Sequence, residues 1–299
     1  MSQIKFCVNL FSFTGFGDAF DKMLDYVRTA EATGYDVINA MDHVVGIIAE
    51  RHGGIAQTPY TAVSTIDECM TLLAYLSAVT SRITLSTRVL ALPQRQAVVL
   101  AKQAAQIDRM SGGRLRLGIG IGYNAVEFEA AGASFPDRAK RFEEQIDVMR
   151  TLWTQDDVTY TGAYHTIRDA SLSPLPLQRP IPLWFGIGRT ITPIPPDKVL
   201  ERVGRLADGW LPLFRMGPEA REAIAKVHAA ARAAGRDPAN LPMEMDLYVG
   251  DKTAADSIER IKKLREFGAT HIHLTFADKT PEGQIESLKR FGDVLAAFA

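Results

Sequence analysis

Asp42 and His43 stand side by side directly after residues 35–41, an apolar run that predicts a buried strand. Histidine changes charge near neutral pH, so a positioned imidazole suits proton transfer or hydrogen bonding to a bound group. In a barrel of parallel strands, side chains at the carboxyl ends of the strands form the active site. The pair is a candidate for catalysis if residues 35–41 belong to such a barrel. A turn-capping Asp42 and a surface His43 explain the pattern equally well.

Three glycines, Gly118, Gly120 and Gly122, are spaced two residues apart in the expected strand 114–124. Alternate residues of a strand face the same side, so this spacing places all three on one face. Glycine weakens a strand unless something must approach its backbone closely. The pattern predicts either a flat ring system on this face or an adjustment of packing inside the sheet. It does not match the GxGxxG spacing of dinucleotide-binding folds.

Polar residues also interrupt the ends of two other apolar runs. Ser86, Thr87 and Arg88 fall late in the expected strand 82–92. The stretch "FGIGRT" (185–190) ends a further strand with two glycines and Arg189. The free backbone amides of this stretch, the guanidinium of Arg189 and the hydroxyl of Thr190 can together clamp a phosphate group.

Metal and nucleophile motifs do not emerge from the cysteines and histidines. Cys7 and Cys69 give neither a disulfide framework nor a metal-binding pattern. His271 and His273 form an HxH pair at the start of the expected strand 270–277. The start of a barrel strand lies on the face that serves stability, so we expect no metal site.

The elements that must position these residues alternate regularly along the chain. Apolar runs predict eight strands: 4–11, 35–41, 82–92, 114–124, 181–188, 208–214, 243–250 and 270–277. Amphipathic stretches predict eight helices: 18–34, 66–80, 97–113, 135–155, 195–207, 218–235, 257–269 and 282–299. Strict alternation predicts an α/β fold, a (β/α)8 TIM barrel over 1–299 as a single domain, with an open doubly wound sheet as the alternative. Residues 157–167 predict a β-hairpin inserted after the fourth helix.

Composition excludes several classes of protein. The chain has 299 residues, 46% hydrophobic and 23% charged, and a net charge of −1. Without a basic surplus, nucleic acid is not an expected partner. No apolar run reaches the roughly 20 residues that span a bilayer, and the N-terminus lacks a signal-peptide pattern. We therefore expect a cytoplasmic protein without a membrane partner.

Four motifs carry a resemblance to a known family. They are "MDHV" (41–44), the long block from "LAYLSAVTSRITLSTRVLALP" to "GIGIGYNAVEFEAAG" (73–132), "RFEEQIDVMRTLW" (141–153) and "LADGWLP" (206–212). Together they resemble the bacterial luciferase-like monooxygenase superfamily over nearly the whole chain. The middle block is most similar to its deazaflavin-dependent oxidoreductases.

The resemblance implies a TIM barrel that holds FMN or the deazaflavin coenzyme F420, without a metal, at its C-terminal face. It places the catalytic pair Asp42 and His43 beside the flavin ring, and a strained, sometimes cis, peptide within Ser86, Thr87, Arg88 and Val89. It further implies cofactor contacts from Ile121, Gly122, Tyr123 and Asn124, with Glu127 as an addition, and a phosphate loop of Gly186, Ile187, Gly188 and Arg189. A homodimer is the usual assembly of the family.

The expected function is that of a flavin-type oxidoreductase acting on a small organic substrate. Reduced FMN would serve monooxygenation with O2 and a separate flavin reductase, whereas reduced F420 would serve hydride transfer. His43 is the expected group for proton transfer or hydrogen bonding near the ring. Two alternatives remain open: a non-catalytic luciferase-like binding or partner protein, and a barrel lyase or isomerase acting on a phosphorylated substrate.

Overall fold

The computed structural model describes residues 3–10, 19–53, 60–188, 193–250 and 252–298. In this part of the chain, parallel strands follow one another in the order β10, β11, β1, β2, β3, β5, β8, β9. Their bounds are β1 Lys5–Asn9, β2 Val37–Ala40, β3 Thr84–Thr87, β5 Leu115–Gly120, β8 Leu183–Ile187, β9 Gly209–Pro212, β10 Glu244–Tyr248 and β11 His271–Thr275. A parallel bridge between Trp210 and Met243 joins the two ends of this order. The predicted TIM barrel is confirmed as a nearly closed barrel, and the open-sheet alternative is wrong.

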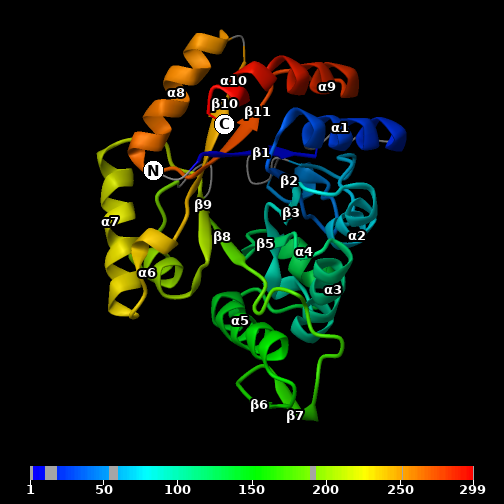
Figure 1. Ribbon diagram of the computed structural model, residues 1–299. Coiled ribbons are helices and arrows are strands. Elements are labelled where there is room, and N and C mark those ends of the chain that lie inside the picture. The colour runs from blue at the N-terminus through cyan, green and yellow to red at the C-terminus, as the bar shows by residue number, and fades with distance from the viewer. Residues whose placement is uncertain (1–2, 11–18, 54–59, 189–192, 251, 299) are drawn as a thin grey trace.

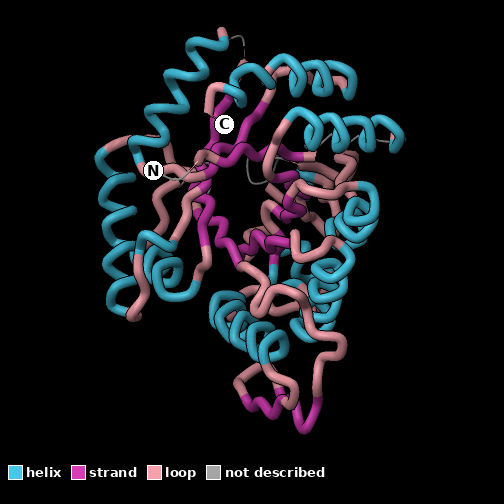
Figure 2. Tube along the Cα trace, viewed as in Figure 1, coloured by secondary structure: helices cyan, strands magenta, loops and turns pink. Residues whose placement is uncertain are grey.

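Helices surround the strands on the outside of the barrel (Figures 1 and 2). Their bounds are α1 Phe20–Thr33, α2 Cys69–Val79, α3 Ala97–Met110, α4 Ala125–Ala130, α5 Arg138–Thr154, α6 Asp197–Leu206, α7 Pro218–Ala233, α8 Ala254–Phe267, α9 Pro281–Arg290 and α10 Gly292–Ala296. The short helix α4 was not predicted, and the expected closing helix is divided into α9 and α10. None of the described helices is long and apolar enough to cross a membrane.

Two further strands, β6 Val158–Thr161 and β7 Thr166–Ala170, pair antiparallel between α5 and β8. They project from the barrel below α5 in Figure 1. Glu144 of α5 holds their turn, because its carboxylate accepts the backbone N–H groups of residues 163–165. The same carboxylate lies 2.9 Å from Nδ1 of His165.

The two faces of the barrel strands differ in chemistry. Outward-facing side chains such as Leu117 and Ile119 of β5 are buried in the apolar layer beneath the helices. Among the inward-facing side chains, Arg116, Glu244 and His273 are buried as well, although they are polar or charged. Burial of apolar area under the helices stabilises the fold by roughly 25 cal/mol per Å². The interior therefore carries specific polar contacts that an apolar reading of the strands did not predict.

The predicted strand 82–92 is interrupted. It forms β3 and the short β4 (Leu90–Ala91), which pairs with β5. Between them the peptide bond joining Arg88 to Val89 is cis. This position lies within the range where the family resemblance placed such a peptide, so that expectation is confirmed.

Candidate active site

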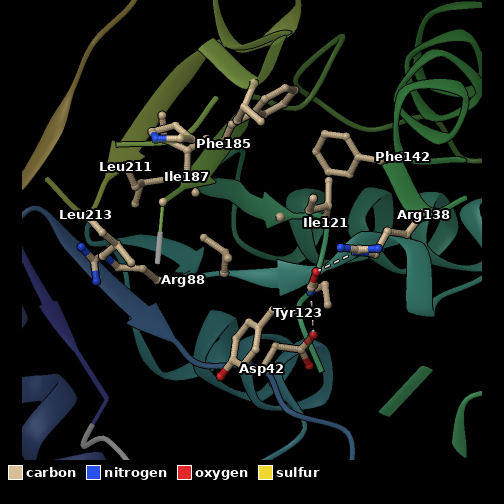
Figure 3. Close-up of a pocket in the computed structure, with 18 of the residues that line it drawn as sticks. Asp42, Arg88, Ile121, Tyr123, Arg138, Phe142, Phe185, Ile187, Leu211 and Leu213 are labelled. Atoms are coloured by element: carbon tan, nitrogen blue, oxygen red, sulfur yellow. Dashed lines mark hydrogen bonds between the residues drawn. The ribbon is translucent and has the colours of Figure 1, made fainter. Parts of the chain in front are cut away.

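A cavity of about 700 Å³ lies at the carboxyl ends of the barrel strands (Figure 3). Its walls come from the residues after β2, the β3–β4 turn, the loop from β5 to α4, β8, and the facing sides of α5 and α6. This volume is usual for cofactor and small-molecule sites. Ten of the predicted site residues line it: Asp42, His43, Arg88, Val89, Ile121, Gly122, Tyr123, Gly186, Ile187 and Gly188.

His43 is held in one orientation by contacts on several sides. Its Nδ1 lies 3.0 Å from Oε1 of Glu127, and that same oxygen accepts the Val44 N–H at 3.1 Å. Its ring stacks on Tyr60, with centroids 3.6 Å apart, and meets Tyr123 edge-on at 6.2 Å. A carboxylate accepts hydrogen bonds, so we infer that Nδ1 carries a proton. Nε2 then remains for a ligand in the cavity.

Asn124 supports this arrangement from outside the cavity. Its side-chain oxygen caps α4 by accepting the Val126 N–H at 3.0 Å, and its Nδ2 donates to the Tyr60 hydroxyl at 2.6 Å. Burial raises the pKa of Tyr60 well above its ordinary value, so the phenol stays neutral. Asn124 therefore positions Tyr60, on which His43 stacks, and its cofactor contact stays a prediction.

Asp42, predicted with His43 as the catalytic pair, lines the cavity and is held by several protein contacts. Its side chain is 2% exposed, and Oδ1 lies 2.5 Å from Nη2 of Arg95. Oδ1 also accepts the Cys69 thiol at 3.5 Å, and Oδ2 accepts the Ala91 N–H at 3.2 Å. Both oxygens are engaged with the protein, and removing one partner of a buried ion pair is costly. Asp42 therefore anchors the turn after β3, and its catalytic role stays a prediction.

The glycines of β5 and β8 make room for the β3–β4 turn. A Cβ on Gly186 would lie 2.7 Å from Val89 Cγ1, and one on Gly120 would lie 3.1 Å from Val89 Cγ2. A Cβ on Gly118 would collide with the carbonyl oxygen of Thr87. These positions confirm the packing alternative rather than a ring lying on all three glycines. Gly122 lies beyond β5, where its φ of +71° and the nearby Phe128 ring require glycine.

Ser86 and Thr87 lie behind the cavity wall and are fully buried. Ser86 Oγ accepts Nε of Arg116 at 2.9 Å and donates to the Thr87 carbonyl oxygen at 3.1 Å. Thr87 Oγ1 donates to the Gly118 carbonyl oxygen at 2.7 Å. These contacts shape the turn, and the cofactor contacts of both residues stay predictions. The predicted phosphate contact of Arg189 lies outside the described residues.

Sequence reasoning missed two arginines that line the cavity from the surrounding helices. Arg138 at the start of α5 donates to the carbonyl oxygens of Gly122 and Phe135, at 3.2 and 2.8 Å, and stacks over the Phe135 ring. Arg202 of α6 donates to Glu143 at 2.7 Å. An arginine on a helix carries no local signal that it faces a ligand, so only the fold identifies these two.

A network of charges lies inside the barrel at the floor of the cavity. Glu244 of β10 is fully buried and lies 2.8 Å from both Arg88 Nε and Arg116 Nη2. Asp246 lies 2.6 Å from Arg88 Nη2 and 2.9 Å from His273 Nδ1. Burial alone would raise the pKa of both carboxyls, but the arginines outweigh it and hold them below their ordinary values. Both acids are therefore ionised.

The HxH pair takes part in this interior. Burial, together with Arg88, lowers the pKa of His273 and keeps its ring neutral beside Asp246. Burial and Arg116 lower the pKa of His271 to about 3. Among the described residues, no group of three or more His, Cys, Asp or Glu side chains could hold a metal ion.

The barrel and the position of the cavity define a class of protein. Parallel strands with surrounding helices form a TIM barrel, and the carboxyl ends of its strands form the ligand site. A sequence profile described as luciferase-like monooxygenase matches residues 6–261. The chain belongs to the luciferase-like monooxygenase family.

Proteins similar to this chain in sequence or in fold include some whose names state a dependence on FMNH2 or on F420. An uncharacterized protein of Mycobacterium tuberculosis is 31% identical over 232 residues, which cover 78% of this chain and 77% of that protein. The FMNH2-dependent dimethylsulfone monooxygenase of Pseudomonas putida is 35% identical over 147 residues, which cover 46% of this chain and 40% of that protein. An F420-dependent secondary alcohol dehydrogenase, solved with an F420-acetone adduct, superposes with a TM-score of 0.79 at 19% identity and covers 100% of both chains.

Proposed function

We propose that this protein is an oxidoreductase that binds FMN or coenzyme F420 in the cavity and acts on a small organic substrate. The observation that carries the proposal is His43, whose ring is fixed by Glu127 at the wall of a coenzyme-sized cavity. Membership of the luciferase-like family supports both coenzymes, because relatives use one or the other.

The residues of the cavity fit such a coenzyme. Both coenzymes carry a flat aromatic ring system with one polar edge, and an anionic phosphate-bearing tail. The walls are mostly apolar side chains and glycine backbone, which suits the ring. At the helical end, Glu143 is shared by Arg202 and Arg205, so this group carries a net positive charge beside Arg138. An excess of arginine suits a phosphate.

When bound, the coenzyme would supply the electron transfer, with O2 as co-substrate in the case of reduced FMN. Arg138 and Arg202, with the backbone of residues 186–188, would hold the tail. The Val89 side chain fills the space beside Gly120 and Gly186 and closes the wall against water. His43 would donate or accept a hydrogen bond through Nε2, and move a proton there, because Glu127 keeps the proton on Nδ1.

The test is a titration of the protein with FMN, FMNH2 and F420, followed by absorbance and fluorescence. Preference for FMNH2 would support an O2-using monooxygenase served by a separate reductase, and preference for F420 would support an O2-independent enzyme. Binding of none of the three would refute the proposal.

A matched pair of arginine variants tests where the coenzyme tail lies. Arg138→Met should weaken coenzyme binding about 10-fold to 100-fold, as expected for loss of a charged hydrogen bond. Arg221 stacks over Phe267 much as Arg138 stacks over Phe135, but it lies outside the cavity. Arg221→Met should leave the coenzyme dissociation constant unchanged.

A further inference from the structure

Arg88 lies at the opposite end of the cavity from Arg138 (Figure 3). It precedes the cis peptide of the β3–β4 turn, and its side chain is 13% exposed. Its neighbours in the lining are apolar and include Val89 and Leu213. A charged side chain in this surrounding needs a reason beyond solubility.

The hydrogen bonds of Arg88 leave one nitrogen for a ligand. Nε donates to Glu244 at 2.8 Å and Nη2 donates to Asp246 at 2.6 Å. Nη1 donates to no described residue, and it is not among the buried nitrogens that lack a partner. Two carboxylates therefore hold the guanidinium still while Nη1 remains accessible from the cavity.

The charges around Arg88 balance, in contrast to those at the helical end. Two arginines, Arg88 and Arg116, face two ionised carboxylates, Glu244 and Asp246, and His273 is neutral. An anion placed at Nη1 would be attracted by Arg88 and repelled by the two carboxylates that Arg88 contacts, so it would gain much less than at an unpaired arginine. An uncharged oxygen would accept the hydrogen bond without that repulsion.

We propose that Arg88 is a specificity-determining residue, whose Nη1 anchors an uncharged oxygen acceptor on a mostly apolar substrate. This inference rests on the proposed function, because it places the coenzyme tail at the Arg138 end and the substrate at the Arg88 end. It revises the prediction that Arg88 contacts the coenzyme.

Three probes of similar shape test the proposal on the coenzyme-loaded wild-type protein by calorimetry. Acetophenone offers an uncharged oxygen, ethylbenzene offers none, and benzoate is an anion. We expect acetophenone to bind more tightly than ethylbenzene by a factor of about 10 or greater, which is the gain in affinity from a hydrogen bond to a charged donor. Benzoate should bind no more tightly than acetophenone. Equal binding of the first two probes, binding of neither, or preference for benzoate would overturn the proposal.

Two variants separate this inference from the proposed function. Arg88→Met removes the counter-charge of Glu244 and Asp246, so its folding is checked first by thermal unfolding. In the folded variant, the preference for acetophenone over ethylbenzene should be abolished while the coenzyme dissociation constant changes less than about 2-fold. Arg138→Met should weaken the coenzyme and leave the probe preference intact. Loss of coenzyme affinity in Arg88→Met, with the probe preference kept, would assign Arg88 to the coenzyme instead. If neither coenzyme binds the wild-type protein, the proposed function fails, and the probes titrated against the protein alone still test Arg88.

Discussion

Replacement of Glu127 by glutamine removes the negative charge beside His43 and keeps the shape of the side chain. The Glu127 side chain is 3% exposed, and its Oε1 accepts from both His43 Nδ1 and the Val44 N–H. A glutamine oxygen can occupy the same position and accept the same two bonds. The second oxygen, Oε2, accepts from Gln94 Nε2 at 3.4 Å, and this long bond is lost when an amide group replaces Oε2. The variant therefore removes the charge, with the shape of the side chain and both bonds at Oε1 kept.

The size of the effect depends on whether His43 takes up a proton. A charged hydrogen bond contributes about 1.5–3 kcal/mol and a neutral one about 0.5–1.5 kcal/mol, so the change costs about 1–2 kcal/mol with a neutral ring. The electrostatic attraction between a carboxylate and a nearby charged imidazole amounts to about 4 kcal/mol at an effective dielectric constant near 20. Since each 1.36 kcal/mol is about tenfold in rate, we expect a loss of roughly 10-fold if His43 only orients and roughly 1,000-fold if it carries the proton.

The assay follows the rate at which the bound reduced coenzyme is reoxidised, together with ¹⁵N NMR of the His43 ring. The control is Glu144→Gln, because Glu144 faces Nδ1 of His165 at 2.9 Å in the hairpin, outside the cavity. We expect the control to keep the wild-type rate. In His43→Ala protein, Glu127→Gln should cause no further loss, since its effect passes through His43. A wild-type rate in Glu127→Gln, or an unprotonated Nδ1 in the wild-type ring, would refute the reasoning.

Three further changes test the packing and the charges of the barrel. Gly186→Ala places a methyl group 2.7 Å from Val89, so the free energy of unfolding in urea should fall by about 1–3 kcal/mol. The control is Gly217→Ala, whose methyl group meets nothing within 4 Å and should not lower the free energy of unfolding through a steric clash. Glu244→Gln leaves two buried arginines short of a counter-charge and should cost about 3–5 kcal/mol in the same assay. The depressed pKa of Glu244 makes wild-type stability fall as the pH drops below the ordinary carboxyl value of 4.5, and the variant should lack that part of the acid dependence. Because the pKa of His271 is lowered to about 3, its NMR signals should not titrate between about pH 5 and 8. For the same reason, the buried His271 should reduce the stability of the protein as the pH falls below 6.5, the ordinary pKa of histidine.

The barrel was predictable because its signal is local and repeated. Each apolar run marks one strand, and the alternation with amphipathic stretches requires parallel crossovers. The polar residues Ser86, Thr87 and Arg88 marked the end of the apolar run, but they did not show that strand 82–92 breaks between Arg88 and Val89. This break depends on Gly120 of β5 and Gly186 of β8, two other strands, which leave space for the Val89 side chain.

The candidate site was predictable only in part, for a related reason. His43 follows from its place at the end of a strand, whereas the role of Asp42 depends on Arg95, 53 positions further along the chain. The interior charges did leave a signal, since Glu244 and Asp246, and likewise His271 and His273, alternate at the period of a strand. Reading the strands as uniformly apolar hid that signal.

The two ends of the cavity differ in net charge although arginine lines both. At the helical end, Arg202 and Arg205 share the single carboxylate of Glu143, and positive charge remains. At the barrel end, Arg88 faces two carboxylates that its neighbour Arg116 helps to neutralise, and no charge remains. A ligand with an anionic tail therefore gains energy in only one of its two orientations along the cavity. Counter-charges, rather than the number of arginines, would then direct a coenzyme's ring toward His43 and leave the barrel end to an uncharged substrate.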